Sequence, residues 1–490
     1  MQRRIGCLIW LVIAMLAVIM LLAWQYIRFR LDSRVLPEGT TMAGLSVAGR
    51  TPEEALNAMD VAFSTPIEIS YQGERILLPP DSVELRYDPE ITAHNLAAAM
   101  QARNFIAYVL HSPTAPREIP VAVTYSIERL DEFLVRIANQ YDRPVQPAIP
   151  LPESLTFTPP QPGYTLDIAA SRTRLIEALV SAGDTDTVVE LVVRVDPPPP
   201  AQSDLLDQLL HTWLESHTDI IPGIFIKDLQ TGDEVTINAD VAFSGLDLLK
   251  IPILVETYRR LDGPPTEEQA TQIGDMMGTA SSNAQANRLL SDLLGGRDAY
   301  RGAEHLTTSM HYLGLINTFM AAPYDAVDVV ISPTIITLAN ARLDIDTHPS
   351  PDMQTTPLEI GLLLEMVYQC TQGGGALLAA YPNDFTPDEC HQIIAWMERN
   401  QTDNWTEAGV PAGTRLAHRH GFSDGTYADA ALVFTSSEDG ESGTGSQDFV
   451  IVVYLFDPQG QGREVMAPLI ANVCQAAYNY FTIRSLENQP

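Results

Sequence analysis

The feature that most constrains this chain is a long run of residues without a charge near its beginning, from Ile5 to Trp24. At about 1.5 Å per residue, a helix of this length is long enough to cross the hydrocarbon core of a bilayer. Trp24 and Tyr26 stand at its end, where amphipathic aromatic side chains favour the membrane–water interface. No small-x-small cleavage site follows, because large and charged residues continue to Arg30. We therefore predict an uncleaved single-pass anchor over residues 5–27 rather than a cleaved signal.

The composition is that of an ordinary folded protein. Of the 490 residues, 46% are hydrophobic and 19% are charged, which allows two or three domains with cores. The net charge of -33 disfavours nucleic acid as a partner, because binding a phosphate backbone requires a basic surface. No His-Glu-x-x-His or Cys-x-x-Cys spacing occurs, so the sequence indicates no metal site and no cofactor.

Residues 35–197 are predicted to form a smaller α+β stalk. Thr51 is an expected helix N-cap, followed by Pro52 at the first helical position. The alternating segment Ile67–Tyr71 is a predicted strand that turns at a Gln-Gly pair into a second strand. A similar order then follows, with a helix at 127–137, a strand at 155–157, a helix at 171–179 and a strand at 188–195. This order suggests two repeats from an internal duplication.

Consecutive prolines after Asp196 form a stiff connection, and residues 198–204 are the predicted linker. The larger domain, residues 205–486, opens with leucines and a tryptophan spaced one helical turn apart. Helices then dominate to about residue 400. The predicted strands lie at 223–229, 234–238, 428–434 and 449–456, and a last helix covers 467–480. The expected class is α+β, an antiparallel sheet with flanking helices and a helical subdomain.

Three short motifs follow one another in this domain. They are Asp247-Leu-Leu-Lys250, Ser281-Ser282-Asn283 and Arg419-His420-Gly421, with Thr355-Thr356-Pro357 standing before the third. In this order they resemble the Ser-x-x-Lys, Ser-Asp-Asn and Lys-Thr-Gly motifs of the serine β-lactamase and penicillin-recognising family, class A in particular. The resemblance implies a β-lactamase-like domain.

The resemblance also implies a chemistry, acyl transfer by a serine whose proton goes to a nearby lysine. Asp247 stands where that family has the nucleophilic serine, and Lys250 stands for the lysine. Ser281 and Asn283 match the first and third residues of Ser-Asp-Asn. These four residues are the expected catalytic set.

The third motif is the expected substrate-binding strand. Arg419 stands for the family's lysine, His420 for its threonine and Gly421 for its glycine. An arginine keeps the positive charge and can bind a carboxylate through two hydrogen bonds, so we expect ligand binding to survive this exchange.

Two departures from the family concern catalysis itself. Asp247 cannot form a hydrolysable ester, and beside Lys250 at a helix N-terminus it is expected to form an ion pair. Class A β-lactamases supply a glutamate for deacylation, and no glutamate occurs here between Glu304 and Glu359. We therefore expect a catalytically impaired member that binds wall peptide or a partner.

Two alternatives remain open. The first is an active β-lactamase or D-Ala-peptidase-type hydrolase that uses Ser281 or Ser244 as nucleophile and acts on β-lactams or peptides. The second is a structural wall spacer, which predicts no pocket between Lys250, Ser281 and Arg419.

The stalk carries a second resemblance. The segment Gly44-Leu-Ser-Val-Ala-Gly-Arg-Thr-Pro-Glu-Glu-Ala55, together with Pro162-Gly-Tyr-Thr-Leu-Asp167, resembles the peptidoglycan-binding domain ascribed to membrane-anchored YoaR/VanW-like proteins. This implies peptidoglycan as a partner and an extracytoplasmic body in a bacterial cell envelope. A spacer without a ligand is the alternative.

Four cysteines occur in the chain. Cys370 ends one predicted helix and Cys390 lies near the start of the next, with a Gly-rich connection between them. An oxidising exterior would permit a disulfide across this helix pair.

Overall fold

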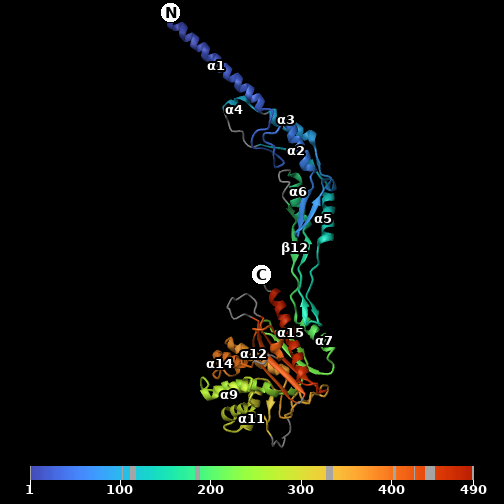
Figure 1. Ribbon diagram of the computed structural model, residues 1–490, viewed down its shortest axis with the longest axis vertical. Helices are drawn as coiled ribbons and strands as arrows, with labels where there is room; N and C mark the ends of the chain where they lie inside the picture. Colours follow the sequence, from blue (N-terminus) through green and yellow to red (C-terminus); the bar gives the residue numbers. More distant parts are fainter. Residues whose placement is uncertain are drawn as a thin grey trace. The chain divides into compact units, whose positions relative to one another are not determined.

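The computed structural model describes residues 2–101, 103–110, 117–181, 188–326, 335–400, 404–423, 425–435 and 447–487 (Figure 1). The first element is helix α1, Gln2–Asp32. Its segment Trp10–Asp32 is long and apolar enough to cross a membrane, and its most apolar stretch is not buried against the rest of the chain. By length and composition alone, this helix fits either a membrane span or a signal sequence.

The chain folds into two compact units. The N-terminal unit comprises residues 1–146 and 161–198, and the C-terminal unit comprises residues 147–160 and 199–490. The hairpin at 147–160 therefore belongs to the second unit, although the sequence assigned it to the stalk. The reason is packing, since Leu155 and Phe157 lie in the second unit's core and the Phe157 ring stands 6.0 Å from Tyr480.

The N-terminal unit is built from short elements. Its helices after α1 are α2 (Pro52–Ser64), α3 (Pro89–Gln101), α4 (Phe105–Val109), α5 (Ile127–Tyr141) and α6 (Ile168–Val180). Its strands are β1 (Thr40–Met42), β2 (Leu45–Ser46), β3 (Ile67–Tyr71), β4 (Glu74–Leu78), β5 (Arg86–Tyr87), β6 (Arg117–Ile119), β7 (Val123–Thr124), β10 (Gly163–Leu166), β11 (Val189–Glu190) and β12 (Val193–Asp196).

Local sequence signals explain several of these boundaries. Thr51 caps α2 and forms a capping box with Glu54, as the Thr-Pro-Glu-Glu sequence predicts. The predicted hairpin is present as β3 and β4, with Ile67 opposite Leu78. The strand expected over 188–195 is instead two short strands that belong to different sheets.

The two halves of this unit share one core. Strand β11 from the second half pairs in parallel with β3 from the first, with Val189 opposite Ile69. Ile69 and Leu134 are packed in the same buried cluster as Leu175. Neither half of the suggested duplication therefore closes a core alone.

The C-terminal unit contains the longer elements. Its helices are α7 (Ser203–Leu214), α8 (Lys250–Arg260), α9 (Glu267–Met277), α10 (Asn283–Leu289), α11 (Ala299–Tyr312), α12 (Pro357–Thr371), α13 (Gly375–Ala380), α14 (Pro387–Met397) and α15 (Arg463–Glu487). Its strands are β8 (Ile149–Leu151), β9 (Thr156–Thr158), β13 (Ile221–Asp228), β14 (Glu234–Ile237), β15 (Phe243–Ser244), β16 (Phe319–Met320), β17 (Met353–Thr355), β18 (Arg415–Ser423), β19 (Thr426–Phe434) and β20 (Phe449–Phe456).

A five-stranded antiparallel sheet in the order β14-β13-β20-β19-β18 forms the centre of this unit. Helices α7 and α15 cover one face, and α9, α12 and α14 lie on the other side (Figure 1). Alternate residues of the central strand β20 point to opposite faces of the sheet. Ile451 and Val453 pack with α7 and α15, whereas Val450 and Val452 pack with the helices on the other side. A strand buried on both faces is expected to be a continuous apolar run, as β20 is.

The structure confirms the predicted α+β class, with helices flanking an antiparallel sheet. The sequence analysis missed β18, because Arg415–Ser423 carries two histidines and two arginines and lacks the apolar alternation of a typical strand. It is the edge strand that carries the third motif.

The predicted disulfide between Cys370 and Cys390 is present and joins α12 to α14. The Cα atoms of the two cysteines lie 6.0 Å apart, within the usual range for a disulfide. Cys474 is a free, buried thiol.

The disulfide should contribute measurably to stability. It closes a loop with a sequence separation of 20, so the chain-entropy estimate gives about 3 kcal/mol. We expect Cys370→Ser/Cys390→Ser to lower the free energy of unfolding in urea by about that amount. The same loss should follow from reducing the wild-type protein, whereas the reductant should leave the double variant unchanged. Two free thiols in protein prepared from an oxidising compartment would contradict the pairing.

Candidate functional site

Asp247 and Lys250 are positioned by a turn with a strained backbone. Strand β15 ends at Ser244, the short helix η2 covers Leu246–Leu249, and α8 begins at Lys250. Leu246 has a φ of 51°, in the left-handed region that a leucine rarely adopts. The Tyr324 hydroxyl donates a 2.8 Å hydrogen bond to its carbonyl. Such strain persists only where the surrounding structure over-determines it, and here it sets the backbone directly before Asp247.

Ser281 lies on a second strained turn. Its φ is 46°, and its backbone N–H donates to the Gly278 carbonyl at 3.0 Å. The next residue, Ser282, is the N-cap of α10 and accepts from the Gln285 N–H. The serine is thereby fixed at a helix entrance facing Lys250.

Arg419 lies on β18, in register with Ala430 of β19, and its side chain has no exposed surface. Its Nη1 donates to the carbonyls of Met277 and Gly278 at 3.1 and 3.4 Å. Its Nη2 donates to Asp247 Oδ2 at 2.7 Å and also to the Ser281 hydroxyl. Nε is buried without a hydrogen-bond partner among the residues that the structure describes. The Arg419 guanidinium therefore binds groups inside the site.

These residues form one closed network around a carboxylate. Asp247 Oδ1 pairs with Lys250 Nζ at 2.8 Å, which is the predicted ion pair, and Oδ2 pairs with Arg419. Lys250 Nζ also donates to Ser281 Oγ at 2.9 Å and to the Ser281 carbonyl at 2.8 Å. The Ser281 hydroxyl in turn donates to Asp247 Oδ2. One anion thus lies between two cations and a serine.

The charged groups of the network shift one another's pKa values. Burial opposes ionisation of Asp247, but Arg419 and Lys250 outweigh it and hold the pKa of the carboxyl below its usual value. Burial lowers the pKa of the Lys250 ammonium to about 8, although Asp247 works in the opposite direction. The Lys250 Nζ lies 5.2 Å from the centre of the Tyr324 ring, a favourable cation–π contact.

The other two residues of the third motif take structural positions. The His420 ring stacks on Trp405 at 5.1 Å, and its Nδ1 lies 3.1 Å from the Asn400 amide nitrogen. Burial lowers the pKa of this imidazole to about 4, so it is neutral at physiological pH. A Cβ at Gly421 would come within 2.8 Å of the Asp247 backbone nitrogen, so only glycine allows this close approach.

The remaining predicted residues lie at or outside this network. Asn283 Nδ2 donates to both carboxylate oxygens of Asp325 at 3.2 Å. Ser244 lies in β15, and its hydroxyl accepts from the Ser350 N–H at 2.8 Å. Of the two serines considered as alternative nucleophiles, the structure therefore brings Ser281 to Lys250 and engages Ser244 elsewhere.

Sequence reasoning missed the supporting residues Tyr324, Asn400 and Asp325, because single residues outside a motif give no signal. It also missed a buried pair behind the third motif, in which His418 Nδ1 lies 3.0 Å from Asp429 Oδ2. No group of three histidine, cysteine, aspartate or glutamate residues suited to a metal ion occurs in the described part of the chain.

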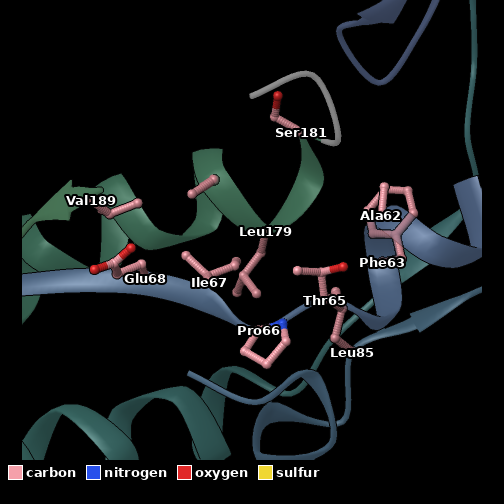
Figure 2. Close-up of a pocket in the computed structure, with 11 residues that line it drawn as sticks. Ala62, Phe63, Thr65, Pro66, Ile67, Glu68, Leu85, Leu179, Ser181 and Val189 are labelled. Carbon is pink, nitrogen blue, oxygen red and sulfur yellow. The ribbon is translucent and has the colours of Figure 1, made fainter. Parts of the chain in front are cut away.

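A second candidate site is a cleft in the N-terminal unit, with a volume of about 210 Å³ (Figure 2). It lies where the C-terminal ends of α2 and α6 meet the beginnings of β3 and β11. Apolar and polar side chains both line it, namely Ala62, Phe63, Pro66, Ile67, Leu85, Ala178, Leu179 and Val189 with Thr65, Glu68 and Ser181. Such a mixed lining suits a ligand with both kinds of surface.

Comparison with known proteins identifies the C-terminal unit. The profile described as "Beta-lactamase enzyme family" matches residues 205–267 and 264–481, more than half of the chain. Solved structures that match part of the chain include a mutant of PBP-A in an acyl-enzyme complex with penicillin G. It matches at 20% identity over 58% of this chain and 99% of its own, with a TM-score of 0.42. An ancestral class A β-lactamase matches at 21% identity over 56% of this chain and 98% of its own, with a TM-score of 0.40. No curated protein matches the chain.

The Asp247 carboxylate should contribute strongly to the stability of the C-terminal unit. Asp247→Ala leaves two buried cations without a counter-charge, so we expect the free energy of unfolding to fall by about 3–5 kcal/mol. Urea unfolding followed by tryptophan fluorescence measures this. Asp275→Ala is the matched control, because Asp275 is exposed on α9 and its removal should change stability by less than about 0.5 kcal/mol. A loss at Asp247 no larger than that of the control would contradict the network.

Proposed function

This chain belongs to the β-lactamase enzyme family, and we propose that it is a member that does not acylate, anchored in a membrane by α1 and binding wall peptide or a protein partner. The observation that carries the proposal is the closed network around Asp247, in which each carboxylate oxygen is paired with a different cation.

The groups that would activate a nucleophile are already engaged in the hydrogen bonds and ion pairs of the network. Lys250 Nζ has three acceptors, Asp247 Oδ1, Ser281 Oγ and the Ser281 carbonyl, which match the three N–H bonds of an ammonium. An ammonium has no lone pair with which to take a proton, and with a pKa of about 8 Lys250 is mostly in this form at pH 7. Asp247 itself stands at the attacking position, and a carboxylate that attacks an amide would give an anhydride rather than a stable ester.

The runner-up is a rewired hydrolase with Ser281 as nucleophile, and one observation favours it. The Ser281 hydroxyl donates to Asp247, which is the arrangement by which a carboxylate can act as general base. Against it, the two cations hold the pKa of Asp247 below its usual value, which makes the carboxylate a weak base. The Ser281 oxygen also accepts from both Lys250 and Arg419, so both of its lone pairs are engaged.

Binding without acylation is supported by the strand beside the network. β18 is an edge strand, with β19 as its partner on one side in the five-stranded sheet. An edge strand can accept an extended peptide through main-chain hydrogen bonds. Phe422, directly after Gly421, is 48% exposed and offers an apolar contact to such a peptide. In this proposal Arg419 positions Asp247 and β18 rather than contacting the ligand directly.

The decisive test is acylation by a labelled penicillin, read by intact mass. We expect no adduct on the wild-type protein, because no alkoxide is available at position 247. Asp247→Ser restores an alcohol beside Lys250 and should acylate slowly and then remain acylated, since each missing general base costs about 10²- to 10⁴-fold in rate. Circular dichroism must first show that the variant is folded, because serine, like alanine, leaves Lys250 and Arg419 without their counter-charge.

The controls separate the two functions. An adduct on the wild type that is lost in Ser281→Ala and kept in Ser282→Ala would contradict our proposal. It would support the alternative, an active hydrolase with Ser281 as nucleophile. Ser282 is the matched control because its side chain caps α10 without entering the network. If Asp247→Ser folds and forms no adduct, the other changes at the site have removed the acylating pocket as well.

We propose further that the N-terminal unit contacts peptidoglycan and that the cleft between α2, α6 and β3 takes part. The full-length protein in detergent should then pellet with purified sacculi at low salt. Ala178→Trp places a large side chain in the cleft and should reduce the pelleted fraction, whereas Glu177→Trp on the exposed side of α6 should not. If the wild-type protein is absent from the pellet, the result contradicts peptidoglycan binding and supports the alternative, a spacer without a ligand.

A further inference from the structure

Helix α4, Phe105–Val109, is packed against the C-terminal end of α1, far from it in sequence. The ring of Phe105 lies 5.4 Å from both Tyr26 and Phe29 in edge-to-face contacts. The Tyr108 ring lies 5.3 Å from Phe29. Aromatic pairs in this geometry stabilise a contact beyond the effect of the area that they bury.

Polar contacts fix the same junction. The Tyr108 hydroxyl donates to the Asp32 carboxylate. Arg103 Nη1 donates to the backbone carbonyls of Asp32 at 2.9 Å and Val35 at 3.0 Å, on the two sides of the end of α1. Asn104 caps α4 by accepting from the Ile106 N–H. The last turns of α1 are therefore part of the folded unit rather than a free extension.

Both helices of this junction carry exposed aliphatic side chains. Ile106 is 65% exposed and Leu110, directly after α4, is 70% exposed. On α1, Ile27 and Leu31 are 59% and 53% exposed. Large aliphatic side chains with this much exposure on both helices of one junction indicate a surface that is covered in the working protein.

The position of this surface along the chain identifies what covers it. It adjoins the segment Trp10–Asp32, which is apolar enough to cross a membrane. Trp24 is 53% exposed and Tyr26 is 49% exposed, and the Arg28 guanidinium lies 4.8 Å over the Trp24 ring. Exposed tryptophan, tyrosine and arginine at the end of a span are typical of the headgroup layer. From Tyr26 to Leu31 the helix rises by only about 8 Å, a distance comparable to the depth at which interfacial helices lie.

We propose that α4, with Ile106 and Leu110, is an interfacial segment that inserts into the lipid headgroup boundary beside the point where α1 leaves the bilayer. The proposal rests on the anchoring role given to α1 above. The ligand is a lipid surface, which takes the aliphatic side chains while the aromatic rings stay against α1. Two attachments, one through the bilayer and one on its surface, then hold the N-terminal unit at a fixed orientation to the membrane.

Site-directed spin labelling of the full-length protein in lipid vesicles tests this. Single cysteines replace Ile106 and Leu110 in a Cys7→Ala background, with the native disulfide kept. Cys474 stays unlabelled because it is buried, and burial raises the pKa of its thiol. The measurement compares access of each label to oxygen, which concentrates in lipid, and to a water-soluble nickel chelate. The vesicles contain phosphatidylcholine and phosphatidylglycerol.

Two reference positions make the result decisive. Leu77→Cys is the matched control, an apolar residue that is 61% exposed on β4 of the same unit. Met20→Cys, 70% exposed on α1, reports the span itself. We expect labels at positions 106 and 110 to lose access to nickel relative to position 77, and to report a shallower depth than position 20.

Each other outcome has a defined meaning. If position 20 reports lipid while 106 and 110 match position 77, the interfacial segment is overturned and the anchor stands. If position 20 also reports water, the anchoring part of the proposed function fails. If 106 and 110 are shielded from both reagents, a protein covers α4, and that result overturns the lipid proposal.

Discussion

The carboxylate of Asp247 is the interaction on which the rest of the site depends. Lys250 and Arg419 have no exposed side-chain surface, and removing each cation from water costs several kcal/mol. One carboxylate that contacts both cations at 2.8 and 2.7 Å offsets much of this cost and leaves a single net positive charge. The left-handed backbone at Leu246 and the glycine at position 421 then follow as conditions for bringing this carboxylate so close to β18. Charge pairing and the local backbone conformation thus depend on each other.

Features of this protein that follow from local patterns are visible in its sequence. The cap at Thr51, the apolar repeat of α7 and the continuous apolar run of β20 each specify an element without reference to distant residues. The order of the three motifs places Asp247, Ser281 and Arg419 on three different elements of one known architecture. The positions of Cys370 and Cys390 relative to two predicted helices permit the pairing that the structure contains.

Features that depend on distant contacts are not visible in the sequence. The polar segment Arg415–Ser423 becomes a strand because β19 pairs along its whole length, which overrides its weak strand pattern. The hairpin at 147–160 joins the C-terminal unit because Phe157 meets Tyr480, more than three hundred residues later. Motif matching also suggested that Arg419 faces a ligand, whereas its hydrogen bonds run to Asp247, Met277 and Gly278. A motif identifies the residue and its strand, and the partner depends on the three-dimensional neighbourhood.

The bridging position of Asp247 also restricts which residues can replace it. Aspartate and serine codons differ at two nucleotides, so a change to serine by single steps passes through asparagine, glycine, alanine or another intermediate. Any uncharged residue there, serine included, leaves Lys250 and Arg419 buried without their counter-ion and lowers the stability of the fold. The same ion pairs that close the site therefore also limit which residues position 247 can accept. A tolerated change to an uncharged residue would require prior replacement of one of the two cations.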